Sequence, residues 1–237
     1  MGWIEDRLRE GRLTVKMLYN HFGFSHVIGI HLYARTAIAG PICVVATTIN
    51  PNHRFNLKPA SQLKEEEVKD LNERIRKKAI MLNLGWAGVD SIEKMGLHRA
   101  IMQAINTALY GVSEFNPPSI IFIDGFHMDP TPNGVRDSKT PVIVVKKGTE
   151  TVDVITAANV IARISRSTVM GMLHKQYPEY MWDQNEGFTT QQHVEAIKKY
   201  GISPHHRDLR NVKALKDIDV FPNEKWRREY ESNYFGE

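Results

Sequence analysis

The sequence has a single cysteine, no long apolar run and no internal repeat. Cys43 stands alone among 237 residues, so no disulfide can form within the chain, and a reducing, cytoplasmic location is expected. No apolar run reaches the roughly 18 residues of a membrane-spanning helix. Residues 1–12 carry charges of both signs, unlike the apolar core of a signal peptide. These absences argue against a disulfide-rich scaffold and against a membrane protein.

Charge of neither sign dominates the chain. Lys and Arg number 31 against 27 Asp and Glu, which gives a formal net charge of +4. This mild positive balance leans toward a polyanion partner, although a solvated basic face would give the same balance. With 42% hydrophobic residues, the chain can bury a core as one domain with appendages.

Hydrophobic periodicity predicts strands that alternate with helices. Strands are expected at 27–30, 43–49, 84–89, 119–125 and 141–147, and helices at 1–25, 61–82, 92–110, 156–176 and 191–200. Ser61 is the expected N-cap of its helix, and Gly201 closes the last one. This order predicts an α/β fold with a mixed central β-sheet flanked by α-helices.

The helix predicted at 156–176 has an apolar and a polar face. Residues expected to point inward are Ile161, Ile164, Thr168, Met172 and Leu173. Residues expected on the opposite face are Asn159, Arg163, Arg166 and Ser167. Asp124 stands beside Gly125 at the end of a buried strand, which is a position typical of a cleft residue, although such an Asp also caps loops.

Several short segments, in the same order along the chain, resemble the ribonuclease HII family. They are the Ala-Gly-Pro turn at 39–41, the strand end at 123–126, the segment 144–148, the helix start at 156–163, the runs 175–180 and 185–190, and the His-Arg pair at 206–207. The resemblance spans roughly Val27 to Arg210 and implies a ribonuclease H-like fold.

The family cleaves the RNA strand of RNA–DNA hybrids with two divalent ions, Mg²⁺ or Mn²⁺, held by four carboxylates. The four positions fall on His31, Leu32, Asp124 and Ser167, of which only Asp124 is acidic. Because Mg²⁺ requires oxygen ligands, this set predicts a poor site, so no cofactor is expected, with Mg²⁺ or Mn²⁺ implied only if the protein is an active ribonuclease. A less favoured interpretation is that Asp124 and His31 hold a softer ion such as Mn²⁺ or Zn²⁺. The alternative for His31 is a hydrogen-bonded core residue.

Extra acids near the motifs offer a less favoured route to a rebuilt metal site. They are Asp129, Asp137, Glu150 and Asp153.

Residues for substrate recognition are altered as well. The family's Gly-Arg-Gly turn is Ala34, Arg35 and Thr36 here, and Phe188 replaces its tyrosine. The residues expected to contact nucleic acid, if the resemblance holds, are Arg35, Thr36, Lys146, Lys147, Arg163, Arg166, Phe188 and Arg207. The alternative is that these basic residues only pack against the fold and form surface ion pairs.

The leading hypothesis is a non-catalytic nucleic-acid-binding or assembly protein of the ribonuclease HII type, with an RNA–DNA hybrid, another duplex or a protein as partner. The alternatives are a divergent metal-dependent ribonuclease with weak or altered activity and a structural subunit that binds only protein. The predicted division is an N-terminal helix at 1–25, a ribonuclease HII-like domain at 26–210 and a C-terminal extension at 211–237. The two ends are the candidate partner surfaces.

Overall fold

The computed structural model describes residues 2–113, 118–125, 140–209, 212–216 and 228. The chain divides into two compact units, which are treated separately below. The sheet unit comprises Met1–Tyr33, Cys43–Trp86 and Met102–Ser165, and the helical unit comprises Ala34–Ile42, Ala87–Ile101 and Arg166–Glu237. Phe126, Asp129, Asp137 and most of the C-terminal extension lie outside the described residues.

A five-stranded mixed sheet forms the centre of the sheet unit. Its strands are β1 (Val27–Tyr33), β2 (Ile42–Ile49), β3 (Ala79–Ala87), β4 (Ile120–Asp124) and β5 (Val142–Val145), in the order β3-β2-β1-β4-β5. Strand β1 pairs antiparallel with β2 and parallel with β4, and β4 pairs parallel with β5. The predicted mixed sheet is therefore confirmed. Every residue of β2 is buried, as expected for a strand covered on both faces.

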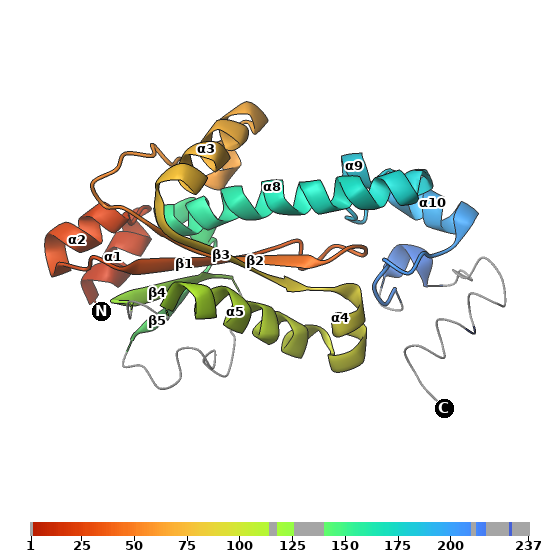
Figure 1. The fold of residues 1–237 in the computed structure, drawn as a ribbon, viewed down its shortest axis with the longest axis horizontal. Helices are drawn as coiled ribbons and strands as arrows, with labels where there is room; N and C mark the ends of the chain where they lie inside the picture. The colour runs from red at the N-terminus through yellow and green to blue at the C-terminus, as the bar shows by residue number, and fades with distance from the viewer. Residues whose placement is uncertain (1, 114–117, 126–139, 210–211, 217–227, 229–237) are drawn as a thin grey trace. The chain divides into compact units, whose positions relative to one another are not determined.

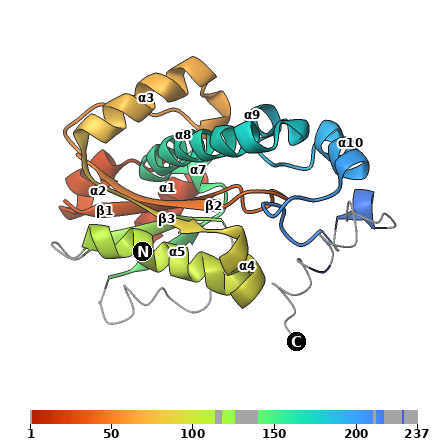
Figure 2. The same ribbon diagram turned by 45° about the vertical axis from the view of Figure 1, so that its right-hand side comes forward.

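Helices cover both faces of this sheet (Figure 1). Helices α3 (Glu65–Lys78) and α8 (Asp153–Gln176) lie on one face and α5 (Leu97–Ser113) on the other, and the turned view agrees (Figure 2). Two glycines permit this close packing. A Cβ on Gly29 of β1 would lie 2.5 Å from the carbonyl oxygen of Val154, and one on Gly85 of β3 would lie 1.8 Å from that of Ala104.

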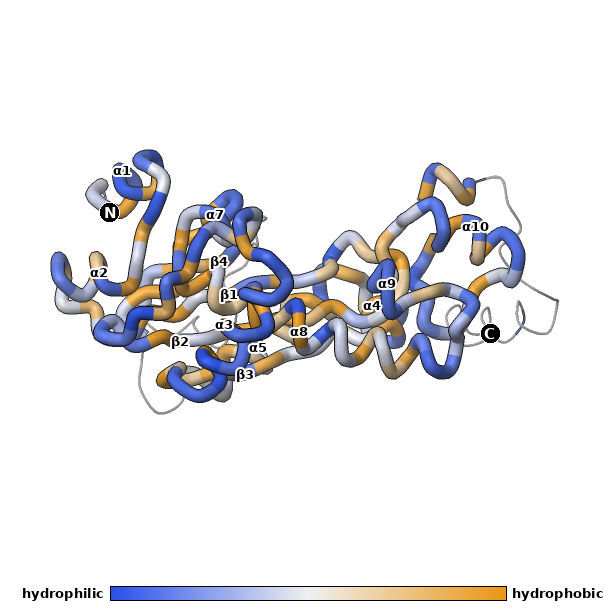
Figure 3. Tube along the Cα trace, turned by 90° about the horizontal axis from the view of Figure 1, so that it is seen from above, coloured by the Kyte–Doolittle hydropathy of each residue, from blue (hydrophilic) through white to orange (hydrophobic). Residues whose placement is uncertain are grey.

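The N-terminal segment forms two helices, α1 (Gly2–Glu10) and α2 (Val15–Phe22), where one was predicted. Gly11 has φ +115°, and Leu13 leaves the helical path to form a β-bridge with Val152. Thr14 then caps α2 with its side chain. Hydrophobic and hydrophilic stretches alternate along α1 and α2 (Figure 3). Ile4, Val15 and Leu18 join the core of the sheet unit, whereas Met17 and Phe22 are exposed.

Several predicted boundaries move. A 3-10 turn, η1 (Ala60–Gln62), precedes α3, whose N-cap is Lys64 rather than Ser61. Helix α3 ends at Lys78, where β3 begins, so β3 starts five residues before the predicted strand. The helix predicted at 92–110 is α4 (Val89–Met95) followed by α5, with the break at Gly96. The helix predicted at 156–176 begins three residues earlier, at Asp153.

The helical unit has its own core. It is built on α9 (Trp182–Asn185), α10 (Gln191–Tyr200), α4 and the short turns η2 (Pro178–Tyr180) and η3 (Lys213–Leu215). Its core includes Met170, Tyr180, Trp182 and Ile197. Met170 takes the buried place on α8 that Met172 was predicted to fill, and Met172 is 58% exposed. The predicted α10 and its closing Gly201 are confirmed.

None of the helices within the described residues is long and apolar enough to cross a membrane.

Candidate functional site

Asp124 ends β4, and both oxygens of its carboxylate are engaged. Oδ1 accepts a hydrogen bond from the backbone N–H of Gly148 at 2.6 Å. Oδ2 lies 2.8 Å from Nδ1 of His31. The short helix α7 (Gly148–Thr151) follows β5, the parallel neighbour of β4, so its first N–H reaches the end of β4. Asp124 is therefore a fixed, nearly buried group, with 13% of its side chain exposed.

His31 on β1 is buried and bonded at both ring nitrogens. Its Nε2 lies 3.0 Å from Nδ2 of Asn159 on α8. The Asn159 amide donates to Nε2, which leaves Nδ1 protonated to donate to Asp124. We name this set the Asp124–His31–Asn159 chain. Of the two interpretations of His31, this geometry is that of the hydrogen-bonded core residue.

The residue beside His31 cannot complete a site on the same face. Successive side chains of a strand point to opposite faces, so Leu32 points away from the face of His31. Ser167, the fourth position implied by the family resemblance, is exposed on the part of α8 that belongs to the helical unit.

Glu150 and Asp153, the two extra candidate acids that the structure describes, bind other groups. Glu150 accepts hydrogen bonds from the backbone N–H and hydroxyl of Ser61. Asp153 accepts from the backbone N–H of Val15 at 3.0 Å, and burial raises the pKa of its carboxyl to about 7. Neither carboxylate joins Asp124.

The donor set was tested against the pair of magnesium ions that the family resemblance implies. Such a pair consists of two ions about 4 Å apart that are held by several carboxylates. Within the described ranges, no three His, Cys, Asp or Glu side chains are grouped to hold an ion. Asp124 supplies the one carboxylate of the chain defined above, next to an imidazole and an amide nitrogen. These residues do not fit two hard cations.

Two lysines directly precede Gly148, the residue whose backbone N–H binds Asp124. Lys146 and Lys147 are exposed, and Arg163 is half-buried on α8. Lys147 has φ +55° as the N-cap of α7. The fold therefore ties two exposed ammonium groups to the backbone segment that holds Asp124.

Arg166 and Arg207 of the helical unit are buried, contrary to the outward position predicted for Arg166 on its helix. The Arg166 guanidinium donates to the carbonyl oxygens of Pro41, Ala39 and Glu186 at 2.8, 2.9 and 2.5 Å. Helical periodicity could not show this, because the acceptors lie on a distant turn and a neighbouring loop. Burial of Arg166 is stable because the guanidinium is hydrogen-bonded.

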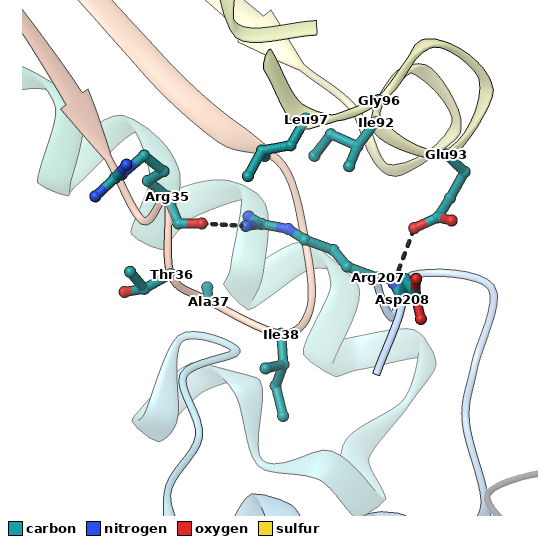
Figure 4. A pocket seen from close by; sticks show the side chains of 10 residues that line it. All are labelled: Arg35, Thr36, Ala37, Ile38, Ile92, Glu93, Gly96, Leu97, Arg207 and Asp208. Carbon is teal, nitrogen blue, oxygen red and sulfur yellow. Dashed lines mark hydrogen bonds between the residues drawn. The ribbon is translucent and has the colours of Figure 1, made fainter. Parts of the chain in front are cut away.

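Arg207 completes the support of the turn at 34–41 (Figure 4). It donates from Nε to the carbonyl oxygen of Gly40 at 2.9 Å and from Nη1 to that of Arg35 at 3.0 Å. Burial, chiefly, lowers the pKa of Arg207 to about 9. The Arg35 side chain points away from the Arg207 guanidinium, and Arg35 and Thr36 are exposed. Two buried arginines thus hold the turn that presents these residues.

Two further features of this region follow from the sequence differences. Ala34 has φ +63°, so the turn keeps a left-handed conformation at a position where the resembled motif has glycine. The ring of Phe188 lies 5.7 Å from the Arg166 guanidinium, where it packs as a cation–π partner. A cavity of about 420 Å³ lies next to the turn, lined on its other side by Glu93 and Leu97 among others.

Comparisons with known proteins agree with this architecture. A family model described as Ribonuclease HII matches residues 28–213. The chain belongs to the ribonuclease HII family. A ribonuclease HII of Caldanaerobacter subterraneus subsp. tengcongensis is 30% identical over 220 residues, covering 91% of this chain and 87% of the relative. One from Natranaerobius thermophilus is 31% identical over 182 residues, covering 76% and 86%.

Solved structures show the same fold. The RNase HII in the PCNA:RNase HII complex from Archaeoglobus fulgidus matches with a TM-score of 0.67 at 15% identity, covering 82% of this chain and 98% of that one. The ribonuclease H2 of Pyrococcus horikoshii OT3 matches with a TM-score of 0.66 at 18% identity, covering 85% and 98%. The predicted ribonuclease H-like fold and the family are therefore confirmed.

Sequence reasoning missed the parts played by Asn159 and Gly148. The signal for Gly148 was present, since it follows the lysines of a recognised segment. For Asn159, the sequence contains no signal beyond its predicted place on the polar face of the helix at 156–176.

Proposed function

We propose that this ribonuclease HII-family protein binds nucleic acid without hydrolysing it. The observation that carries the proposal is the engagement of both Asp124 oxygens, by His31 at 2.8 Å and by Gly148 at 2.6 Å. His31 stands where the family resemblance implies the first metal-binding carboxylate. The His31 imidazole donates a hydrogen bond to the buried Asp124 carboxylate, so the carboxylate is stabilised there without a bound cation.

The energetics support this proposal. A metal ion at Asp124 would compete with the His31 hydrogen bond for the same carboxylate, and a buried hydrogen bond to a charged group contributes about 1.5–3 kcal/mol. The ion would have a single carboxylate as its ligand, whereas Mg²⁺ binding depends on several oxygen ligands. An RNase HIII, a relative by fold, has been solved in complex with Mn²⁺, so Mn²⁺ is the ion to test.

Binding is supported by what the fold preserves. Arg166 and Arg207 hold the turn that exposes Arg35 and Thr36, and Lys146 and Lys147 are exposed beside the Asp124 segment. Lys and Arg contacts to phosphates supply most of the sequence-independent affinity for nucleic acid. The substrate of the family, an RNA–DNA hybrid, is the first ligand to test; a protein partner is also compatible, given a relative solved with PCNA.

The test combines cleavage and binding on one labelled RNA–DNA hybrid. With Mg²⁺ or Mn²⁺ present, we expect no cut RNA, but an increase in fluorescence anisotropy that reports binding. The logarithm of the association constant should fall with the logarithm of the salt concentration, with a slope of about 0.9 for each phosphate contact. The double variant Lys146→Gln/Lys147→Gln should lower that slope by about two. The matched control Lys77→Gln/Lys78→Gln changes two exposed lysines at the end of α3.

A second measurement addresses the ion directly. Mn²⁺ should leave the thermal unfolding of the unmodified protein unchanged. His31→Asp should lower stability without metal, because two carboxylates would then face each other, and should regain part of it with Mn²⁺. Hybrid cleavage by the unmodified protein, lost in Asp124→Ala, would refute the proposal and favour the divergent ribonuclease.

A further inference from the structure

A cavity of about 220 Å³ lies between the N-terminal helices and the loop after β2 in the sheet unit. One wall comes from Arg12, Thr14 and Lys16, at the start of α2, and the other from the loop at 50–57, which includes His53 and Arg54. Residues 1–27 lie outside the segment matched by the family model. Four of the thirteen lining residues, Arg12, Thr14, Val15 and Lys16, therefore lie outside the segment that the family model matches.

The strand register separates this cavity from Asp124. Ile49, the last residue of β2, lines the cavity. Strand β2 runs antiparallel to β1 with Gly29 opposite Thr47, and β1 starts opposite the start of β4, with Val27 beside Ile120. The cavity thus lies at the end of the sheet where β4 begins, whereas Asp124 is where β4 ends.

The lining of the cavity carries an excess of positive charge. Within the part of the chain that the structure describes, the side chains of Arg12, Lys16 and Arg54 make no hydrogen bond or ion pair, unlike Arg7, Arg9 and Arg74, which pair with Glu10, Asp6 and Asp70. Asp153 is the one acid of the lining, and its carboxylate accepts the N–H of Val15. Burial raises the pKa of Asp153 to about 7 against the opposing effect of the nearby Arg12 charge, so Asp153 compensates only part of one cation at neutral pH.

We propose that this cavity binds a phosphate group, and that Arg12, Lys16 and Arg54 are its ligands. Three cations against at most one anion favour a ligand with more than one negative charge, which a phosphate monoester has and a carboxylate lacks. Guanidinium groups bind phosphate oxygens in pairs, and an ammonium adds a point charge. Thr14 and Asn50 supply further polar groups on the two walls. The phosphate has two possible sources, a small phosphorylated molecule or the end or backbone of a nucleic acid.

The test is calorimetric titration of the full chain with inorganic phosphate at low ionic strength, with chloride and acetate as comparison anions. We expect saturable binding of phosphate, weakened at least tenfold in Arg54→Gln and in Arg12→Gln. Arg9→Gln removes one charge from a 78%-exposed side chain of α1 that does not line the cavity, and it should change the affinity less than twofold. Circular dichroism confirms that each variant is folded.

A second arm identifies the source of the phosphate. A short DNA with a 5′-phosphate and the same DNA without it are competed against phosphate, alongside the RNA–DNA hybrid. Competition by the DNA strands or hybrid assigns the site to nucleic acid, and lack of competition assigns it to a small phosphorylated ligand. No saturable phosphate binding, or equal losses in Arg9→Gln and Arg54→Gln, overturns the proposal. Hybrid binding that persists in Arg54→Gln leaves the function proposed above intact.

Discussion

Acid should unfold this protein through two buried histidines, His193 and His206, of the helical unit. Both are almost fully buried, with exposed fractions of 0% and 1%. Nε2 of His193 accepts from the indole N–H of Trp182 at 3.0 Å, and its Nδ1 donates to the carbonyl oxygen of Phe188 at 2.9 Å. This bonding requires a neutral ring, because an imidazolium has no acceptor.

The second ring depends on the first. Nδ1 of His206 accepts from the backbone N–H of Ser203 at 2.8 Å, so the proton is on Nε2, which lies 3.1 Å from Nε2 of His193. A proton on either ring would place two donors against each other. Burial, as the main cause, lowers the pKa of His193 and lowers that of His206 well below its usual value, with the neighbouring His193 adding to the shift on His206.

The sign of the pH effect follows from these shifts. A histidine whose folded pKa is depressed contributes stability that is present above the unfolded pKa of about 6.5 and is lost as the pH falls below it. If neither ring takes up a proton while folded, each lowers the free energy of unfolding by about 2 kcal/mol between pH 7.5 and pH 5. The two histidines together can therefore lower the free energy of unfolding by at most about 4 kcal/mol over this pH range.

Urea unfolding followed by tryptophan fluorescence at pH 7.5, 6.5 and 5.0 measures this loss. His206→Gln keeps a donor and an acceptor but cannot titrate, so the dependence on pH should fall by about half even if the variant is less stable at pH 7.5. His98→Gln, at an exposed position of the same unit, should leave the dependence unchanged. A free energy that stays constant down to pH 5, or an equal effect of both substitutions, would refute the reasoning.

Three other substitutions test the sheet unit and the turn at 34–41. Asp153→Asn should raise stability relative to the unmodified protein, with a gain that grows from about pH 4 to pH 7 and is constant above pH 7. The folded carboxyl, with its pKa raised to about 7, keeps its proton in this range while the unfolded carboxyl loses it, so the unmodified protein loses stability as the pH rises; unfolding curves at several pH values show it. Gly85→Ala should destabilise by about 1–3 kcal/mol or more, since its Cβ would meet the carbonyl oxygen of Ala104 at 1.8 Å, whereas Gly88→Ala has open space and should change the unfolding midpoint little. Ala34→Gly should stabilise by up to about 1 kcal/mol, because glycine relieves the cost of φ +63°, and a loss of stability would contradict that interpretation.

Local sequence signals predicted those parts of the fold that local forces determine. Helix α10 has a capping Thr190, a hydrophobic face and a closing Gly201, and its predicted bounds are confirmed. The N-terminal helix was predicted as one piece, because the pairing of Leu13 with Val152 is a contact between residues 139 apart. No local pattern contains that information.

The candidate site shows the same limit more strongly. Asp124 was found from its strand end and from the family motif, but its contacts are to His31, 93 residues away, and to Gly148. Helical periodicity placed Arg166 outward, yet carbonyl groups of the turn at 39–41 satisfy its guanidinium inside. A buried cation is stable only with such acceptors, and their positions depend on the tertiary fold.

The pattern of hydrogen bonding shows how the buried carboxylate of Asp124 is stabilised. Loss of metal-binding carboxylates alone would leave Asp124 as a buried, unpaired charge, which costs several kcal/mol. Here a histidine on β1 donates to Asp124, an asparagine on α8 donates to that histidine, and a backbone N–H takes the remaining carboxylate oxygen. These partners come from three separate elements and engage both oxygens of Asp124 and both ring nitrogens of His31, whereas Oδ1 of Asn159 has no hydrogen-bond partner within the described residues. Hydrogen bonds to protein groups are sufficient to compensate the burial of the Asp124 carboxylate, and this supports the non-hydrolytic binding function proposed above.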